Sequence, residues 1–413
     1  MRVAVVTESF LPAVNGVTNS VLHVISHLRA RGHEALVVAP GAGPDEVPDT
    51  DVHPSGGRRV PVVRVPAVDL PVVDSLPVGV PTPAVRAALA EFRPDVVHLA
   101  SPFVLGARAL TVARRMRIPT VAVYQTDVAG FAASYGVGLT ARAAWRWTRR
   151  LHARADRTLA PSSWAVDALE AHGVPRVHRW GRGVDTSRFR PLAEHADGGS
   201  AAAALRRELA PRGEMLVGYV GRLAAEKQVE RLAALADLPG VRLVVVGDGP
   251  ARERLAELLP GAAFLGFRGG DDLATAYAAL DGFVHTGPFE TFCQAVQEAK
   301  AAGLPVLAPD AGGVRDLVEP GETGWLFDAG SDAAAAGGLR ERVRAWRDDP
   351  ALRRRMGHAA RASTRGRTWP AVCDELLGHY AELVGTADDS RGAHRLVTRG
   401  SAGERPGPVD TAA

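Results

Sequence analysis

Cysteine is scarce in this chain of 413 residues, which contains only Cys293 and Cys373. Two cysteines cannot form a disulfide framework, so the sequence does not describe a small secreted scaffold held by disulfides. No run of about 18 apolar residues occurs, which argues against a membrane-spanning helix. Residues 1–7 resemble a first β-strand and lack the apolar run and cleavage site of a signal peptide. We therefore expect a soluble cytoplasmic protein.

Lysine is almost absent as well. Of 49 basic residues only Lys227 and Lys300 are lysines, and the formal net charge is +3. This small charge gives little support for binding to nucleic acid. Because nearly every other basic residue is arginine, a specific role is more plausible for each of the two lysines.

The length and the 46% share of hydrophobic residues predict a globular protein of two domains. Short Val-rich runs alternate with helical patterns, which favours an α/β fold with parallel sheets. We place the domain boundary near residue 190, so that the domains span residues 1–190 and 191–368. A final helical pattern covers Trp369–Val384, and residues 386–413 are expected to form a disordered tail. The predicted strands are Arg2–Thr7, Glu34–Pro40, Val96–Ala100, Thr120–Thr126, Thr158–Pro161, Met215–Val220, Arg242–Gly247, Ala263–Phe267, Gly282–Thr286 and Pro305–Ala308.

The most informative motif joins two carboxylates, Glu290 and Glu298, across a strand-to-helix junction. Glu290 follows the strand Gly282–Thr286 and a Gly-Pro turn, and Glu298 is predicted two turns into the next helix. The free N–H groups at the start of that helix, those of Thr291, Phe292 and Cys293, would bind an anion such as phosphate. Carboxylates on either side of a phosphate site suit sugar and ribose hydroxyls. The motif therefore predicts a nucleotide-sugar site.

The same spacing has a plainer explanation, because two glutamates also occur at such a distance in ordinary helices. The context favours function. A charged loop at the carboxyl end of a strand is where open α/β sheets bind ligands.

Two cations, Arg222 and Lys227, follow the strand that ends at Gly221. Together they could neutralise a diphosphate and stabilise it as a leaving group. The alternative is a solvated loop with ordinary surface charges. The presence of one of the two lysines of the chain favours the first interpretation.

In the first half, the loop around Gly16 follows the first strand and could bring its backbone close to a ligand. It does not have the G-x-G-x-x-G pattern, so a dinucleotide site is unsupported. Gln125 and Asp127 end another predicted strand, where groups that bind an acceptor or take part in catalysis would lie. A simple polar strand end is the alternative.

Arginines recur at helical spacing in the first half, with two tryptophans among them and a single acid, Asp156. Such a face resembles an interfacial helix that contacts anionic lipid. An ordinary surface helix in an arginine-rich protein is the alternative. The arginines are Arg142, Arg146, Arg149, Arg150, Arg154 and Arg157, and the tryptophans are Trp145 and Trp147.

Taken together, these motifs resemble the retaining glycosyltransferases of GT-B fold and E-x7-E type. Residues 287–299 (GPFETFCQAVQEA), 221–227 (GRLAAEK) and 183–185 (GVD) carry the resemblance, which covers residues 1 to about 385. Residues 8–17 (ESFLPAVNGV) and 124–130 (YQTDVAG) look closest to actinobacterial α-mannosyltransferases that use GDP-mannose and glycosylate lipids.

The resemblance implies two Rossmann-like domains facing across a cleft, with the helix at 369–385 returning to the first domain. The second domain would hold the sugar nucleotide without a metal or other cofactor, and the enzyme could be peripheral on the inner face of the cell membrane. The resemblance also implies roles for single residues. Glu290 would contact the donor sugar, and Glu298 would contact the ribose. Arg222 and Lys227 would hold the diphosphate together with the Gly16 loop.

One departure from the family concerns Gln125, because many relatives carry histidine there. The resemblance therefore leaves open whether Gln125, Asp127 or a backbone carbonyl guides the acceptor hydroxyl.

The expected function is thus retaining transfer of a hexose, mannose from GDP-mannose, to a lipid or glycolipid. A UDP-sugar-dependent glucosyl- or sulfoquinovosyl-type transferase, a nucleotide-sugar epimerase and a non-catalytic nucleotide-sugar-binding protein remain as alternatives.

Overall fold

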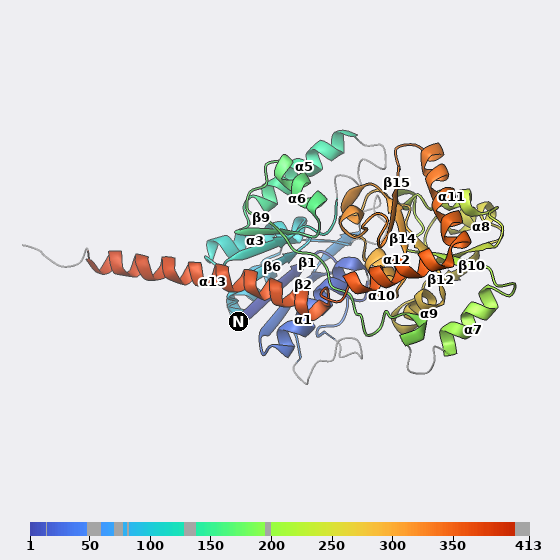
Figure 1. The fold of residues 1–413 in the computed structure, drawn as a ribbon. Helices are drawn as coiled ribbons and strands as arrows, with labels where there is room; N and C mark the ends of the chain where they lie inside the picture. Colours follow the sequence, from blue (N-terminus) through green and yellow to red (C-terminus); the bar gives the residue numbers. More distant parts are fainter. Residues whose placement is uncertain are drawn as a thin grey trace, which may run out of the picture.

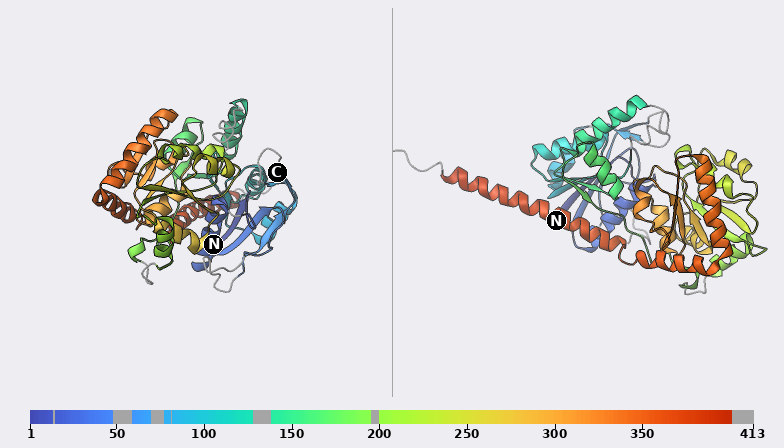
Figure 2. Two further views of the ribbon diagram at one scale, coloured as in Figure 1. Left: turned by 90° about the vertical axis from the view of Figure 1, so that its right-hand side faces the viewer. Right: turned by 45° about the horizontal axis from the view of Figure 1, so that its top comes forward.

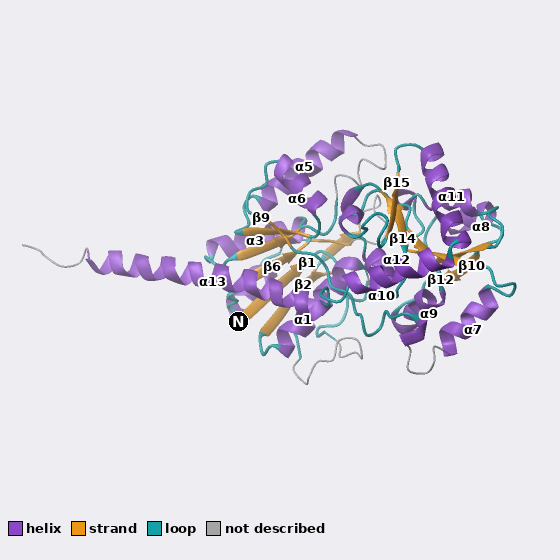
Figure 3. Ribbon diagram, in the orientation of Figure 1, coloured by secondary structure: helices purple, strands orange, loops and turns teal. Residues whose placement is uncertain are grey.

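The fold is seen in a computed structural model that describes residues 1–13, 15–47, 59–69, 77–80, 82–127, 138–194 and 200–400. Two α/β domains lie side by side, and each is built on its own sheet (Figures 1 and 3).

The first domain is a seven-stranded parallel sheet in the order β3-β2-β1-β6-β7-β8-β9, with a two-stranded antiparallel sheet formed by β4 and β5. Its strands are β1 (Arg2–Thr7), β2 (Glu34–Pro40), β3 (Val62–Val65), β4 (Ala67–Asp69), β5 (Pro77–Gly79), β6 (Val96–Ala100), β7 (Thr120–Val123), β8 (Arg157–Ala160) and β9 (Val177–Arg179). Its helices are α1 (Gly16–Ala30), α2 (Ala84–Phe92), α3 (Val104–Arg115), α5 (Gly138–His152) and α6 (Ser163–Ala171).

The second domain is a six-stranded parallel sheet in the order β12-β11-β10-β13-β14-β15. Its strands are β10 (Met215–Val220), β11 (Val241–Val246), β12 (Ala263–Gly266), β13 (Gly282–Val284), β14 (Val306–Pro309) and β15 (Gly324–Phe327). Its α-helices are α7 (Ser200–Leu209), α8 (Arg252–Leu258), α9 (Gly270–Ala279), α10 (Gln294–Ala301), α11 (Asp332–Asp348) and α12 (Pro350–Ser363). Short 3-10 helices are η1 (Leu192–Glu194), η2 (Ala225–Lys227), η3 (Val229–Leu235) and η4 (Gly312–Asp316).

The central strands are apolar along their whole length because helices cover both faces of each sheet. In β10 every residue is buried, and in β1 every residue after Arg2 is buried. The ten predicted strands are all present, with ends that differ by a few residues at most. The parallel α/β fold predicted from the Val-rich runs is confirmed.

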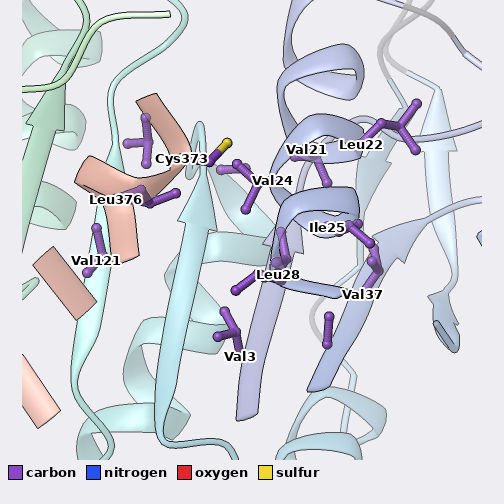
Figure 4. Packing of buried hydrophobic residues seen from close by; sticks show 14 of the residues in the cluster. Val3, Val21, Leu22, Val24, Ile25, Leu28, Val37, Val121, Cys373 and Leu376 are labelled. Atoms are coloured by element: carbon purple, nitrogen blue, oxygen red, sulfur yellow. The ribbon is translucent and has the colours of Figure 1, made fainter. Parts of the chain in front are cut away.

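The last helix, α13 (Trp369–Gly400), returns from the second domain to the first. Val372, Leu376 and Tyr380 are buried against residues of α1 and the first sheet. Figure 4 shows Leu376 on the side of Val121 of β7, and Cys373 beside Val24 of α1. The side chain of Tyr380 also reaches the buried His98, with 2.5 Å between the hydroxyl and Nδ1. The predicted return of the final helix is confirmed.

Two predicted boundaries need correction. The predicted domain boundary at 190 is several residues late, because Val184 and Phe189 already pack in the core of the second domain. The residues predicted as a disordered tail begin as helix, since α13 continues to Gly400 and extends away from both sheets (Figure 2). No proline interrupts the chain between Pro370 and Gly400, so the packed part of α13 can propagate. Residues 401–413 lie outside the described residues.

Among the described residues, no helix combines the length and the hydropathy that crossing a membrane requires.

Candidate active site

The candidate site lies where the carboxyl ends of the two parallel sheets meet. Gln125 follows β7 of the first domain, and Lys227 and Glu290 follow β10 and β13 of the second. The domains touch directly here, because the Thr291 hydroxyl donates to the backbone carbonyl of Gln125 at 3.0 Å. A second contact between the domains joins the Ser163 backbone N–H to the Asp316 carboxylate at 2.7 Å. Loops from both domains therefore build one site.

The centre of the site is an ion pair between Lys227 and Glu290. The Lys227 Nζ donates to Glu290 Oε1 at 2.6 Å, and His285 Nε2 lies 3.3 Å from the same oxygen. Burial alone would raise the pKa of Glu290, but Lys227 and then His285 outweigh it and hold that pKa well below its usual range. Burial opposes the charge of Lys227, yet Glu290 keeps the pKa of Lys227 above its ordinary value. Both groups are therefore charged at neutral pH.

The pKa of the buried His285 follows the same balance. Burial lowers it, but Cys293 and Glu290 outweigh burial and raise the pKa of His285 to about 10. The carboxylate of Glu290 thus lies between two cations.

Arg222 follows the same strand as Lys227 but has its own carboxylate partner. Its guanidinium donates to Glu226 at 2.5 Å, and the Arg222 side chain is 46% exposed while that of Glu226 is buried. The two predicted diphosphate ligands therefore come from one loop, which runs from the end of β10 into η2. Each already has an acidic partner in the absence of a bound anion.

The other lysine of the chain has a structural contact. Lys300 is buried in α10 and its Nζ donates to the backbone carbonyl of Leu317. Only Lys227 of the two lysines thus lies in the candidate site.

Glu298 lies on α10 with its carboxylate against the hydroxyl of Tyr277, at 3.3 Å from Oε2. Burial raises the pKa of Glu298 to about 7, although hydrogen bonds from Tyr277 and Gln294 act in the opposite direction. Near neutral pH this carboxyl therefore changes charge easily.

The helix that carries Glu298 begins later than predicted. Cys293 has a left-handed backbone, with φ of 80°, so α10 starts only at Gln294. Thr291 and Phe292 precede the helix, so the prediction that they belong to its first turn is wrong. Cys293 is the N-cap residue, and its N–H belongs to the free donors together with those of Gln294 and the residues after it. Glu298 is likewise just over one turn into the helix, whereas two turns were predicted.

The glycine loop after β14 packs on this segment. The Gly313 N–H donates to the carbonyl of Glu290 at 2.7 Å, and Gly312 has φ of 62°. A Cβ on Gly313 would lie 2.2 Å from the carbonyl oxygen of Thr291. Glycine is therefore required for the close approach that fixes the backbone around Glu290.

In the first domain, Gly16 is the first residue of α1. Gln125 is buried, and its Oε1 accepts a hydrogen bond from Arg182 at 2.6 Å. The Asp127 carboxylate instead accepts from the hydroxyl of Tyr124 at 3.0 Å. Arg182 was not among the predicted site residues. Its position next to the GVD motif was the only signal in the sequence.

The predicted membrane-contact residues lie in or near α5, and four arginines are exposed there: Arg142, Arg146, Arg149 and Arg150. Trp147 is 36% exposed. Trp145 is half-buried, and its ring stacks on His172 at 3.7 Å and packs with Tyr124. The helix ends at His152, so Arg154 and Arg157 do not continue its face as predicted.

Among the described residues, one group has metal-ligating atoms close together: His285, Glu290 and Cys293, within 4.8 Å of one another. The Lys227 ammonium is already paired with the Glu290 carboxylate, with 2.6 Å between Nζ and Oε1. A metal cation bound here would face the positive charge of this ammonium, which opposes its binding.

Comparison with known proteins agrees with this geometry. A sequence profile described as Glycosyltransferase Family 4 matches residues 14–188, and one described as Glycosyl transferases group 1 matches residues 202–363. A GDP-mannose-dependent alpha-mannosyltransferase of Mycolicibacterium smegmatis is 55% identical over 388 residues, which cover 93% of this chain and 98% of that protein. The chain belongs to this glycosyltransferase family.

Two further relatives of the enzyme are a second mannosyltransferase and a transferase named for a different sugar. A GDP-mannose-dependent alpha-mannosyltransferase of Mycobacterium tuberculosis is 54% identical over 93% of this chain and 97% of its own length. The sulfoquinovosyl transferase SQD2 of Arabidopsis thaliana is 33% identical over 91% of this chain and 72% of its own.

Solved structures show the same fold. Sucrose-phosphate synthase from Thermosynechococcus elongatus superposes with a TM-score of 0.76 at 21% identity, over 93% of this chain and 99% of that one. Anabaena Alr3699/HepE in complex with UDP-glucose gives a TM-score of 0.71 at 21% identity, over 93% and 100%. The enzyme has the GT-B fold, as the resemblance implied.

The pKa of Glu298 predicts how donor affinity depends on pH. If the ionised carboxylate accepts hydrogen bonds from the ribose, affinity is full above pH 7 and is lost as pH falls through 7, by about tenfold per pH unit. Calorimetry with GDP-mannose checks this, since its diphosphate is esterified at both ends and does not titrate near pH 7. Glu298→Gln should give a flat profile. A wild-type affinity that does not change below pH 7 would contradict this role.

Proposed function

We propose that the enzyme transfers mannose from GDP-mannose to a lipid or glycolipid acceptor with retention of the anomeric configuration, without a metal. The observation that carries the donor assignment is the identity of 55% and 54%, along nearly the whole chain, to proteins named as GDP-mannose-dependent alpha-mannosyltransferases. Membership of this family also favours transfer over the two alternatives of epimerisation and simple binding.

The geometry of the second domain supports a role in holding the donor. Arg222 and Lys227 follow the carboxyl end of β10. Lys227 contacts Glu290, which lies four residues before the start of α10. A diphosphate bound between these groups would replace carboxylate contacts of both cations with phosphate contacts. Two cations and a helix N-terminus would then stabilise the negative charge that develops on the leaving phosphate.

In the proposed reaction the bond between the sugar C1 and the phosphate oxygen breaks, and its electron pair stays on that oxygen. The acceptor oxygen bonds to C1 on the same face. Its proton passes to the departing phosphate oxygen, so GDP leaves and no protein base is needed. Contacts between the domains, such as Thr291 to Gln125, would exclude water during this step.

The exposed arginines of α5 support the lipid part of the proposal. Arg142, Arg146 and Arg150 are exposed on a helix without an acid, and Trp147 is partly exposed beside them. Arg149 is set apart from these three because its guanidinium packs against Gly173. Its Nε lies 3.3 Å from the position that a Cβ at residue 173 would take. A cationic helix with an aromatic side chain suits the surface of an anionic membrane, and we propose peripheral binding there.

Thermal unfolding with a panel of donors tests the nucleotide and sugar. We expect stabilisation by GDP-mannose and GDP, because a ligand that binds only the folded state adds RT ln(1 + [L]/Kd) to stability. UDP-glucose, UDP-glucuronate and UDP should give no shift at the same concentrations. A shift confined to the uridine nucleotides would overturn the mannose proposal and favour glucosyl- or sulfoquinovosyl-type transfer.

Vesicle binding tests the arginine face. Changing Arg142, Arg146 and Arg150 together to Glu should abolish most binding to phosphatidylglycerol vesicles, since each basic residue contributes about 1 kcal/mol at such a surface. Binding of GDP should not change. The matched control carries the same charge change on exposed arginines of the second domain, Arg344, Arg354 and Arg355. Equal losses in both triple variants would show an effect of net charge and remove the case for α5.

A further inference from the structure

Arg182 is a buried cation at the junction of the two domains. It is 9% exposed, and it lies in the segment that follows β9 and enters the second domain. Its guanidinium donates to the Gly16 carbonyl at 3.2 Å and to Gln125 Oε1 at 2.6 Å. None of the ion pairs among the described residues includes Arg182. Burying a cation costs free energy, so we infer that the hydrogen bonds of Arg182 have a specific role in positioning their partners.

The contact with Arg182 determines how the Gln125 amide lies. A guanidinium can only donate, so the Gln125 oxygen must face it and the Gln125 Nε2 must face the other way. In the described part of the chain no group accepts a hydrogen bond from that Nε2. Because its partner is charged, the bond is strong, and it polarises the amide so that the N–H groups become better donors.

The second domain holds both members of this pair. The Thr291 hydroxyl donates to the Gln125 carbonyl at 3.0 Å, and Gln297 Nε2 donates to the Arg182 carbonyl at 2.9 Å. Thr291 directly follows Glu290, and Gln297 directly precedes Glu298. The donor loop and α10 thus contact the backbone of both members of the Gln125–Arg182 pair, and the Thr291 contact joins the second domain to the first.

We propose that Arg182 is a positioning residue that orients Gln125 as a hydrogen-bond donor to the transferring sugar or to the acceptor hydroxyl. The inference rests on the proposed transfer reaction. It assigns Gln125 as a donor, since an amide has no basic atom that could take the proton of the acceptor. It also links that orientation to the docking of the two domains.

The variant Gln125→Glu separates this role from a structural one. A carboxylate at 125 keeps the bond to Arg182, now as an ion pair, but has no N–H to donate. We expect its kcat for mannosyl transfer to fall by about 3- to 10-fold, the range of one lost hydrogen bond between neutral groups, with the donor KM little changed. If the pair served only to join the domains, Gln125→Glu would turn over like the wild type, and that result would overturn the proposal.

A second measurement tests whether Arg182 acts through Gln125. Arg182→Met should lower kcat by a similar factor, Arg182→Lys should recover part of it, and Arg182→Met should add little in the Gln125→Ala background. Independent, multiplicative losses would contradict the positioning role. Thermal stabilisation by GDP reports that each variant is folded. Absence of mannosyl transfer by the wild-type enzyme would refute the proposed function itself, which is a different outcome from an active Gln125→Glu variant.

Discussion

The ion pair between Lys227 and Glu290 is the interaction on which the rest of the site depends. It joins the loop after β10 to the loop after β13, with 2.6 Å between Nζ and Oε1. Removing one member of such a buried pair commonly costs about 3–5 kcal/mol, because the other charge is left without a partner. The surrounding backbone is built to keep the pair in place. Gly312 and Gly313 pack against the carbonyl groups of Glu290 and Thr291, where larger residues would not fit.

The same pair places a cation where a phosphate would be bound while it keeps that cation balanced beforehand. A lone buried ammonium would lose its proton or destabilise the fold. With Glu290 as its partner, Lys227 stays charged, and an arriving diphosphate competes with a carboxylate instead of meeting a neutral amine. Arg222 and Glu226 repeat this arrangement at a more exposed position. In the proposed reaction the second domain therefore holds two charged, balanced cations before the donor arrives.

Much of this could be predicted from the sequence, because fold and charge leave local signals. Continuous Val-rich runs predict strands covered on both faces, and these strands fix the loops in which Lys227 and Glu290 lie. The edge strands β3, β9 and β15 were not among the predicted strands, because each is only partly buried and none forms a continuous buried run. Periodicity identifies the fully buried central strands more readily than such edge strands.

The remaining differences arise from tertiary contacts that have no local signal. Cys293 adopts a left-handed conformation that its residue type does not favour, so α10 begins after it. Trp145 is packed because His172 comes from the next helix, which no periodicity shows. Arg182 lies in a linker motif, and only folding brings it to Gln125, 57 residues away along the chain.

The most direct test of the account is the turnover of Lys227→Ala with saturating GDP-mannose and a lipid extract as acceptor. Arg254→Ala, which removes a 77% exposed arginine of the same domain, is the matched control. The account predicts that kcat of Lys227→Ala falls by about 10²- to 10³-fold, the usual loss when one group that stabilises transition-state charge is removed. The control should remain at the wild-type value. Near wild-type turnover by Lys227→Ala would contradict the claim that this cation stabilises the leaving diphosphate.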